Sequence, residues 1–282
     1  MTAPTSFLPV DYDAPPVNPI GVGLYSAATI IDQTGPSRFL SAGIEIRPRN
    51  CATGWGTWDA DPCATPAVDA LKSGDRPVAG DPFEPLVIWG YDECGPLEDF
   101  TAYEERALQN ARLHEQGLAE AHFGARLVAD STPTTVADIV AAVSVLEVAL
   151  GEAGFYGVIH ASARFAAYAA QANLIIRSSG SPILRTPLGH TWAFGAGYED
   201  TLGAELVATG PVTVWRDPLV VRSTLDERHN IKAAIAERGL VIGYECLVTA
   251  VTVAAGGDDG GAPFPGDNVF PAGDVFPDET GA

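Results

Sequence analysis

Nearly forty consecutive residues in the first third of the chain show little sign of regular structure. Residues 47–85 are dominated by Pro, Gly and Asp around Trp55 and Trp58, without helical or strand periodicity. Connections within a compact domain usually have about 4–6 residues. A connection of this length is difficult to place inside one compact domain, so we expect it to project from the body and to contact a neighbouring subunit.

The two tryptophans have two interpretations. They could stack on a sugar, but packing of a long loop on a neighbouring subunit is the preferred interpretation. Two cysteines bracket them, and a bond between Cys51 and Cys63 would close a small loop and contribute up to about 3 kcal/mol. Because we expect a cytoplasmic protein, reduced thiols are favoured over this disulfide.

Charge and composition exclude several classes of function. The 282 residues include 16 basic and 36 acidic ones, a net charge of −20, and no stretch gathers Lys and Arg into a patch. This argues against nucleic acid as a specific ligand, because phosphate binding needs several positive charges. The N-terminus lacks the pattern of a signal peptide. No apolar run reaches the roughly 20 residues of a membrane span, so we expect no membrane contact.

The stretch from Glu98 to Phe123 predicts one long helix with a thin apolar face. Its large or buried-type residues are Phe100, Tyr103, Ala107, Ala111, Leu118 and Phe123. A helix packed in a globular core usually has an apolar stripe at least about 100° wide. We therefore expect this helix to lie across a sheet or another chain, and to end where residues 124–131 break it.

The remaining segments predict a mixed α+β chain. Residues 24–46 contain two short β-type runs, and Leu86–Trp89 a strand. Thr135 resembles the start of a capping box, before an amphipathic helix whose stripe is Ile139, Val143, Leu146 and Leu150. Then follow a buried strand "GVIHAS", an alanine-rich helix, the strands "HTWAFGAGY" and "AELVATGPVTVWRDPLVV", and two β runs from Asn230 to Val253 with a break near Arg238 and Gly239.

A search for catalytic motifs gives one weak candidate. The sequence contains no nucleophile elbow, phosphate-binding loop or dinucleotide fingerprint. His160 ends a buried strand and faces Ser162, a place where α/β enzymes put catalytic groups, but a core histidine with satisfied hydrogen bonds is the favoured interpretation. The four cysteines form no C-x-x-C pair, and no histidines have ligand spacing. We expect no catalytic, cofactor or metal site.

The order of these segments resembles the major capsid protein fold of tailed bacteriophages, which encapsulin shells share. The matching pieces are "EDFTAYEERALQNARLHEQGLAEAHF" at the position of the family's spine helix, "TVADIVAAVSVLEVAL…GVIHASARFAAYAAQ" at its central helix, strand and helix, "TPLGHTWAF" at the following turn, and "ATGPVTVWRDPLVV…NIKAAIAERGLVIGYECLVTAVTV" at its closing strands. The resemblance covers residues 24–253.

The resemblance implies a division of the chain into parts. These are an N-terminal arm (1–37), an extended loop (38–85), a peripheral domain with the spine helix (86–134), an axial domain (135–210), return strands of the peripheral domain (211–255) and an acidic Gly/Pro-rich tail (256–282). It implies that the loop overlaps an adjacent subunit and that the arm reaches another. The expected subunit-interface residues are Trp55, Trp58, Phe100, Tyr103, Phe264, Phe270 and Phe276.

The function that the resemblance implies is structural. The chain would self-assemble into the pentamers and hexamers of an icosahedral bacteriophage capsid that encloses DNA without binding it specifically. It would be located in the virion after assembly in the host cytoplasm, with scaffold, portal or decoration proteins as further partners. The alternatives are an encapsulin-like nanocompartment shell, a minor virion protein (decoration or head–tail), and an α/β hydrolase-like enzyme that uses His160.

Overall fold

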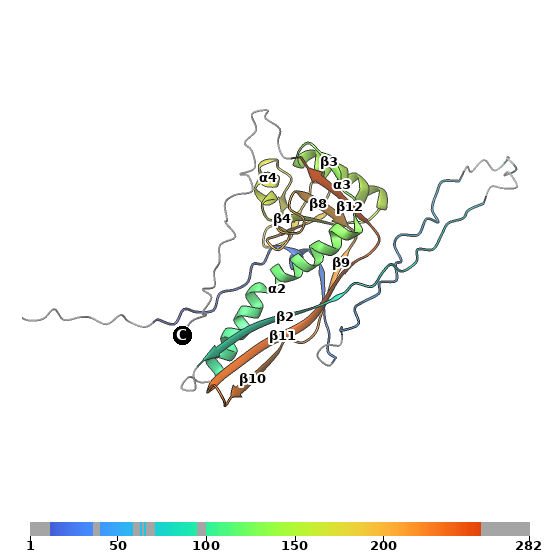
Figure 1. Cartoon of the computed structure of the whole chain (residues 1–282). Coiled ribbons are helices and arrows are strands. Elements are labelled where there is room, and N and C mark those ends of the chain that lie inside the picture. The colour runs from blue at the N-terminus through green and yellow to red at the C-terminus, as the bar shows by residue number, and fades with distance from the viewer. Residues whose placement is uncertain are drawn as a thin grey trace, which may run out of the picture.

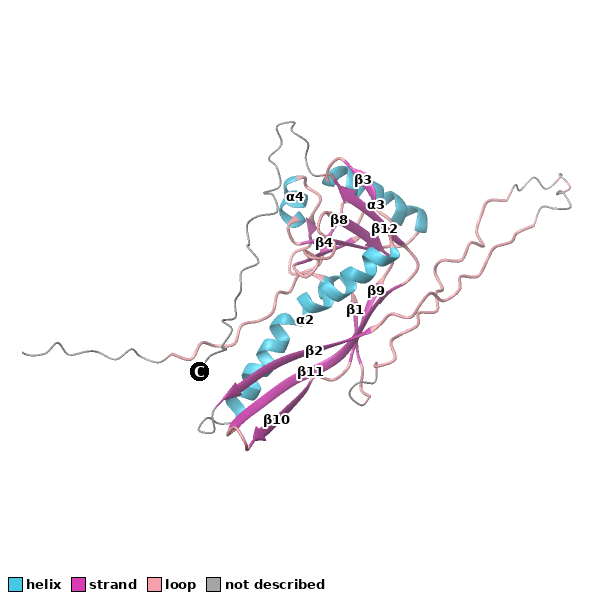
Figure 2. Ribbon diagram, in the orientation of Figure 1, coloured by secondary structure: helices cyan, strands magenta, loops and turns pink. Residues whose placement is uncertain are grey.

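The computed structural model of the chain describes residues 12–35, 40–58, 63, 65, 71–94 and 100–254. Its architecture is α+β, with a compact upper part and a long lower sheet (Figure 1). The helix α2 (Phe100–Asp130) runs between the two parts, and an extended loop projects away from both (Figure 2).

The lower, peripheral sheet is built on β11 (Ile231–Tyr244), a strand of 14 residues. β2 pairs along one side of it, and β10 and β9 pair in succession along the other side. β1 adds to β9 in parallel. The bounds of these strands are β1 (Thr29–Asp32), β2 (Pro85–Cys94), β9 (Val212–Arg216) and β10 (Val220–Asp226).

The upper, axial sheet has the strand order β3-β12-β8-β4-β7-β6-β5. Two helices accompany it, α3 (Ile139–Ala153) against β12 and β8, and the shorter α4 (Phe165–Gln171) beside β4. The strand bounds are β3 (Thr134–Val136), β4 (Val158–Ser162), β5 (Ile176–Arg177), β6 (Leu184–Arg185), β7 (Thr191–Gly195), β8 (Glu205–Thr209) and β12 (Val248–Val253).

The long helix packs on the peripheral sheet through small residues, which explains its thin apolar face. Ala107 and Ala111 on α2 are buried against Ala234 and Ala236 on β11. A Cβ atom at Gly90 on β2 would lie 2.3 Å from the carbonyl oxygen of Ala107 and 2.5 Å from the amide nitrogen of Ala111. The helix therefore lies against the sheet at a distance that only glycine and alanine allow.

The helix is longer than its sequence predicts, and the expected break after Phe123 is wrong. α2 continues through Gly124 to Asp130, and a Cβ atom at Gly124 would lie 2.1 Å from the Thr201 hydroxyl oxygen. Gly124 thus allows close packing of α2 against the segment that contains Thr201. Phe123 and Leu127 are buried in the core that α2 shares with both sheets, whereas Leu118, expected on the apolar face, is 48% exposed.

The prediction for α3 is confirmed in its core stripe and wrong in its cap. Ile139, Val143, Leu146 and Leu150 are all buried. The N-cap is Asp138, whose carboxylate accepts a hydrogen bond from the amide of Ala141 at 2.8 Å. Thr135 instead belongs to β3, where it pairs with Thr252.

Three other expectations differ from the structure. The first β-type run begins as a helical turn, α1 (Leu24–Ala27), before β1. In the second run, the described residues contribute only an isolated bridge between Ile44 and Phe83. β11 passes through Arg238 and Gly239 without a break. Gly239 allows Asp217 to approach, because a Cβ atom there would lie 2.8 Å from that carboxylate.

We expect Gly90→Ala to lower the free energy of unfolding by about 1–3 kcal/mol, because the added methyl group meets helix backbone that cannot rotate away. Gly117→Ala is the matched control, since a Cβ atom there has nothing within 4 Å and should stabilise α2 by roughly 0.5–1 kcal/mol. Urea unfolding measures both changes. Equal effects of the two substitutions would contradict the packing argument.

Candidate subunit interfaces

The buried histidine of β4 is a core residue with both ring nitrogens satisfied. His160 is fully buried, with Nδ1 3.0 Å from the Tyr198 hydroxyl and Nε2 3.0 Å from the Thr209 hydroxyl. Burial lowers its pKa from 6.5 to about 3, so the ring is neutral at physiological pH. Ser162 hydrogen-bonds Glu199, which also pairs with Arg164. His160 and Ser162 therefore do not form the nucleophile–base pair that the enzyme alternative requires.

The segment from Val22 to Tyr25 is hydrogen-bonded to α2 of its own chain. Gln116 accepts a hydrogen bond from the amide of Tyr25 at 3.3 Å and donates one to the carbonyl of Val22 at 2.9 Å. The buried carboxylate of Glu120 accepts the amide of Leu24 at 3.1 Å and that of Gly197 at 3.1 Å. Burial raises the pKa of Glu120. The expectation that the whole arm reaches a different subunit is thus corrected for this segment.

A second polar cluster ties the same segment to the peripheral sheet. Glu115 accepts a hydrogen bond from the Tyr25 hydroxyl at 2.9 Å and lies 3.6 Å from Arg216 and 3.4 Å from Arg238. Burial, together with the charge of Glu115, raises the pKa of Tyr25. Arg216 also pairs with Asp32 of β1 at 2.8 Å. These groups fix the path of the arm before the extended loop begins.

The base of the extended loop, where residues 44 and 83 lie side by side, is held in place by α2. We call this part of the loop its neck. Ile44 and Phe83 exchange two backbone hydrogen bonds at 3.0 and 2.9 Å. Arg126 of α2 donates to the carbonyl of Pro82 at 3.1 Å, and its guanidinium lies 4.6 Å from the centre of the Phe83 ring. Farther along the loop, the amide of Thr53 donates to the carbonyl of Asp75 at 3.2 Å. The outgoing limb of the loop (residues 40–58) and the returning limb (residues 71–85) are therefore linked to each other and to the body.

A disulfide joins the outgoing limb of the loop to the turn between β11 and β12. It links Cys51 with Cys246, whose Cα atoms are 5.5 Å apart. Cys51 therefore does not pair with Cys63, and the expectation of four reduced thiols is wrong for this pair. Next to it, the Glu245 carboxylate accepts the amides of Arg49 at 2.6 Å and Asn50 at 3.0 Å. Burial opposes its ionisation, but these hydrogen bonds prevail and lower the pKa of Glu245.

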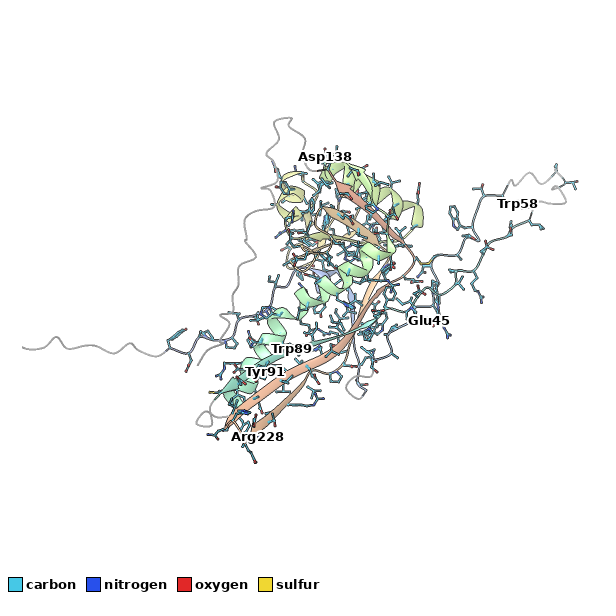
Figure 3. The ribbon with its side chains drawn as sticks, viewed as in Figure 1. Glu45, Trp58, Trp89, Tyr91, Asp138 and Arg228 are labelled. Atoms are coloured by element: carbon cyan, nitrogen blue, oxygen red, sulfur yellow. A yellow bond between two sulfur atoms is a disulfide. The ribbon has the colours of Figure 1, made fainter. Side chains whose placement is uncertain are left out.

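Of the two tryptophans of the loop, Trp58 lies far from the body in Figure 3. Trp55 is 81% exposed, and Trp58 lies beneath the ammonium group of Lys72, 5.1 Å from its ring centre. Phe100 is 36% exposed at the start of α2, with Lys232 4.3 Å from its ring centre. Tyr103 is fully buried, because it fills the space between α2 and β11, so in this structure it has no surface for another subunit. Phe264, Phe270 and Phe276 lie outside the described residues.

An exposed apolar face that the sequence analysis missed lies on the peripheral sheet. Val87, Trp89 and Tyr91 alternate along β2 on the side away from α2, and Ile235 lies directly opposite Tyr91 on β11. Their exposed fractions are between 39% and 62%, and Figure 3 shows Trp89 and Tyr91 in place. We call these four residues the outer sheet face. The alternation in "PLVIWGYDEC" was the signal that could have predicted it.

A groove lies at the edge of the same sheet. A space of about 1280 Å³ lies between β2, α2, the segment around Pro19–Val22 and residues of the upper part of the molecule such as Ala163 and Phe194. Its apolar lining includes Ile20, Val22, Leu113, Leu118 and Phe194. Among the described strands, β2 pairs only with β11, so its other edge borders this groove. Exposed apolar surface of this extent is typical of an interaction site.

The helices of the described part of the chain do not include one with the length and apolar character to cross a membrane. Within the same residues, Cys51, Glu245 and Cys246 are the one group with ligand atoms close enough for a metal ion. Cys51 and Cys246 are bonded to each other in the disulfide, so they do not supply thiolates to a metal ion.

Comparison with solved structures identifies the class of fold. The chain aligns with a capsid protein of an empty GTA particle at a TM-score of 0.50 and 13% identity, over 89% of this chain and 96% of that chain. The mature capsid of bacteriophage PhiM1 gives 0.49 and 13%, over 88% and 92%. A structure of Mycobacterium phage Adephagia gives 0.48 and 13%, over 87% and 95%.

The chain has the major capsid fold of tailed bacteriophages, as the order of its sequence elements predicts. No protein-family model matches the sequence, and no curated protein matches it. At 13% identity the likeness defines the fold, and the function is a separate inference.

We expect Cys51→Ser to lower the free energy of unfolding by roughly 2–4 kcal/mol under non-reducing conditions, because the disulfide closes a loop of 195 residues and restricts the unfolded chain. Urea unfolding with and without a reductant measures the change. Cys63→Ser is the matched control and should cost far less. A reductant that leaves wild-type stability unchanged would show that the pair does not form.

We expect the stability of the protein to fall as the pH drops below about 6.5, by up to about 1.4 kcal/mol per pH unit from His160 alone. The folded-state pKa lies below the unfolded value, so the contribution of this group is complete above pH 6.5 and is lost as the pH falls toward about 3. His160→Asn should flatten this part of the profile, measured by urea unfolding at several pH values. Parallel profiles would contradict the assignment.

Proposed function

We propose that this chain is the structural subunit of an icosahedral bacteriophage capsid, in which copies assemble into pentamers and hexamers around DNA. The observation that supports this most directly is the extended loop, which projects from the body (Figure 1) and carries Trp55 with 81% of its surface exposed. The capsid fold adds to it. Apolar surface of this kind is stabilised only when another molecule covers it.

The contacts of a subunit in such a shell follow from its exposed apolar surfaces. The loop, with Trp55 and Trp58, would lie on an adjacent copy, and the outer sheet face and the groove beside β2 would receive neighbouring elements. Phe100 lies at the far end of the peripheral domain, where it would face another copy. We keep the proposed parts as arm 1–37, loop 38–85, peripheral domain 86–134 with return strands 211–255, and axial domain 135–210.

The proposed role has no catalytic step. His160 is buried with its ring nitrogens hydrogen-bonded to Tyr198 and Thr209, and Ser162 hydrogen-bonds the partly exposed Glu199 instead of the histidine. We propose that the partner of the chain is itself, in a virion formed in the host cytoplasm, with scaffold, portal or decoration proteins as further partners. The DNA would be enclosed without specific recognition, in keeping with a charge of −20.

An encapsulin-like nanocompartment shell or a minor virion component would use the same fold. The former would co-purify with an enclosed enzyme when expressed in its host, and the latter would be present at low copy number in particles. No feature of the described residues favours either over a capsid subunit.

We expect the purified full-length chain to form uniform shells or capsomer sheets in negative-stain electron microscopy. Trp89→Ser should prevent or weaken this assembly, since Trp89 is 62% exposed and its loss removes apolar area at an interface without altering the core. Circular dichroism checks that the variant is folded, and sedimentation velocity measures its assembly. A wild-type protein that stays monomeric at every concentration tested, also with its virion partners present, would contradict the proposed function.

A further inference from the structure

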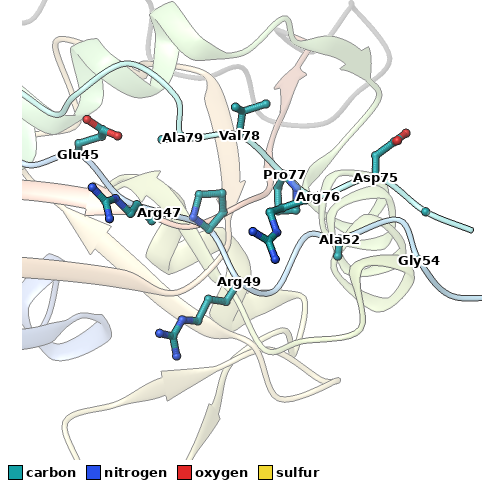
Figure 4. Close-up of a pocket in the computed structure, with 12 residues that line it drawn as sticks. Glu45, Arg47, Arg49, Ala52, Gly54, Asp75, Arg76, Pro77, Val78 and Ala79 are labelled. Atoms are coloured by element: carbon teal, nitrogen blue, oxygen red, sulfur yellow. The ribbon is translucent and has the colours of Figure 1, made fainter.

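A basic cleft lies at the base of the extended loop, although no stretch of the sequence gathers basic residues. It encloses about 860 Å³ between the two limbs of the loop. Arg47 and Arg49 come from the outgoing limb and Arg76 from the returning limb, and Figure 4 shows their side chains extending to the same side of the cleft. The fold thus brings together three positive charges that are separated in sequence.

The guanidinium groups of this cleft differ from most arginines of the body. Six other described arginines pair with carboxylates, whereas Arg112, Arg177, Arg185 and Arg228 do not. The pairs are Arg106–Asp92, Arg126–Asp130, Arg164–Glu199, Arg216–Asp32, Arg222–Glu237 and Arg238–Glu115. Within the described residues, Arg47 and Arg76 have no ion pair. Glu45 and Asp75 also line the cleft; in Figure 4 the Asp75 carboxylate points away from the arginines, and Glu45 lies on the same side of the view as Arg47.

The cleft also has an apolar wall. Pro48, Pro77 and Val78 lie among the arginines, and Val78 is 88% exposed. A ligand that matches this lining must therefore present carboxylates or phosphates together with apolar groups.

The C-terminal segment of the same chain has this chemistry. Residues 256–282 contain six acidic residues and no basic one, and Phe264, Phe270 and Phe276 are each followed by proline. Residues 255–282 lie outside the described part of the structure.

The segment also begins within reach of the cleft. Cys246, bonded to Cys51 at the loop base, is followed by β12, whose six residues span about 20 Å. The 27 residues from 256 to 282 can extend up to about 90 Å. A tethered segment also has a high effective concentration at a nearby site on its own chain.

We propose that the acidic C-terminal segment, residues 256–282, docks in the cleft of Arg47, Arg49 and Arg76 of its own chain. Its carboxylates neutralise the guanidiniums, and its Phe-Pro pairs cover Pro48, Pro77 and Val78. This assignment places Phe264, Phe270 and Phe276 on their own loop base instead of a neighbouring subunit. It is independent of the proposed capsid role, because it concerns contacts within one chain.

Zero-length carbodiimide crosslinking of the full-length chain tests the proposal. The triple variant Arg47→Lys, Arg49→Lys and Arg76→Lys keeps the charge and supplies amines that the reagent joins to carboxylates in direct contact. Mass spectrometry should find these lysines linked to Asp267, Asp274, Asp278 or Glu279, in a species that migrates as a single chain. The links should be lost at about 1 M salt, where the Debye length is only about 3 Å.

The matched control moves the same three amines outside the cleft, in the variant Arg112→Lys, Arg177→Lys and Arg228→Lys. These positions are exposed, and their links to the C-terminal segment should be rare. Phe270→Ser with Phe276→Ser, placed in the cleft-lysine background, should reduce the yield if the apolar wall contributes.

Four outcomes would overturn the proposal. Equal yields in both lysine variants would show non-specific contact, and links that join two chains would place the segment on a neighbour. Links from the cleft lysines to body carboxylates would identify a different occupant. Finally, the cleft would be a phosphate site if two results were found together. Duplex DNA would block the links, and it would bind the wild-type protein but not the triple variant Arg47→Glu, Arg49→Glu and Arg76→Glu.

Discussion

The packing of α2 on the peripheral sheet is the contact on which the rest of the fold depends. Gly90 allows the helix backbone to approach the sheet, and alanines on α2 and β11 fill the remaining space. The same helix then enters the shared core with Phe123 and Leu127. Its sides carry Glu115, Gln116 and Glu120, which hold the arm, and its end carries Arg126, which holds the neck of the loop.

The sequence predicted those elements whose stability is local. The stripe of α3 and the fully buried β4 follow from periodicity, and both are confirmed. The capsid fold was predicted from element order, since no single residue carries it. The errors concern tertiary contacts. Gly124 and Gly239 look like breaks in a sequence, but in the structure they accommodate Thr201 and Asp217. From the sequence, reduced thiols were favoured over a Cys51–Cys63 bond, whereas the fold places Cys246 beside Cys51 and the two form a disulfide.

The predictions of exposed interface residues also failed where tertiary contacts decide which side chains are exposed. Trp55 and Trp58 were expected on a projecting loop, and there the structure places them. Tyr103 was expected at a subunit interface, but it is buried between α2 and β11 among alanines of both elements, a contact that depends on how the helix packs on the sheet. The outer sheet face needs the register between β2 and β11, which brings Ile235 opposite Tyr91. The cleft of three arginines likewise exists only because the limbs of the loop are paired.

The central claim is that the loop and the outer sheet face are completed by other copies of the chain. Hydrogen–deuterium exchange of assembled against dissociated protein tests it most directly. We predict that amides of residues 52–58 and 71–79 and of β2 exchange more slowly in the assembled state, because a neighbour covers them. Exchange that is equally fast in both states, in particles shown to be intact, would contradict the account.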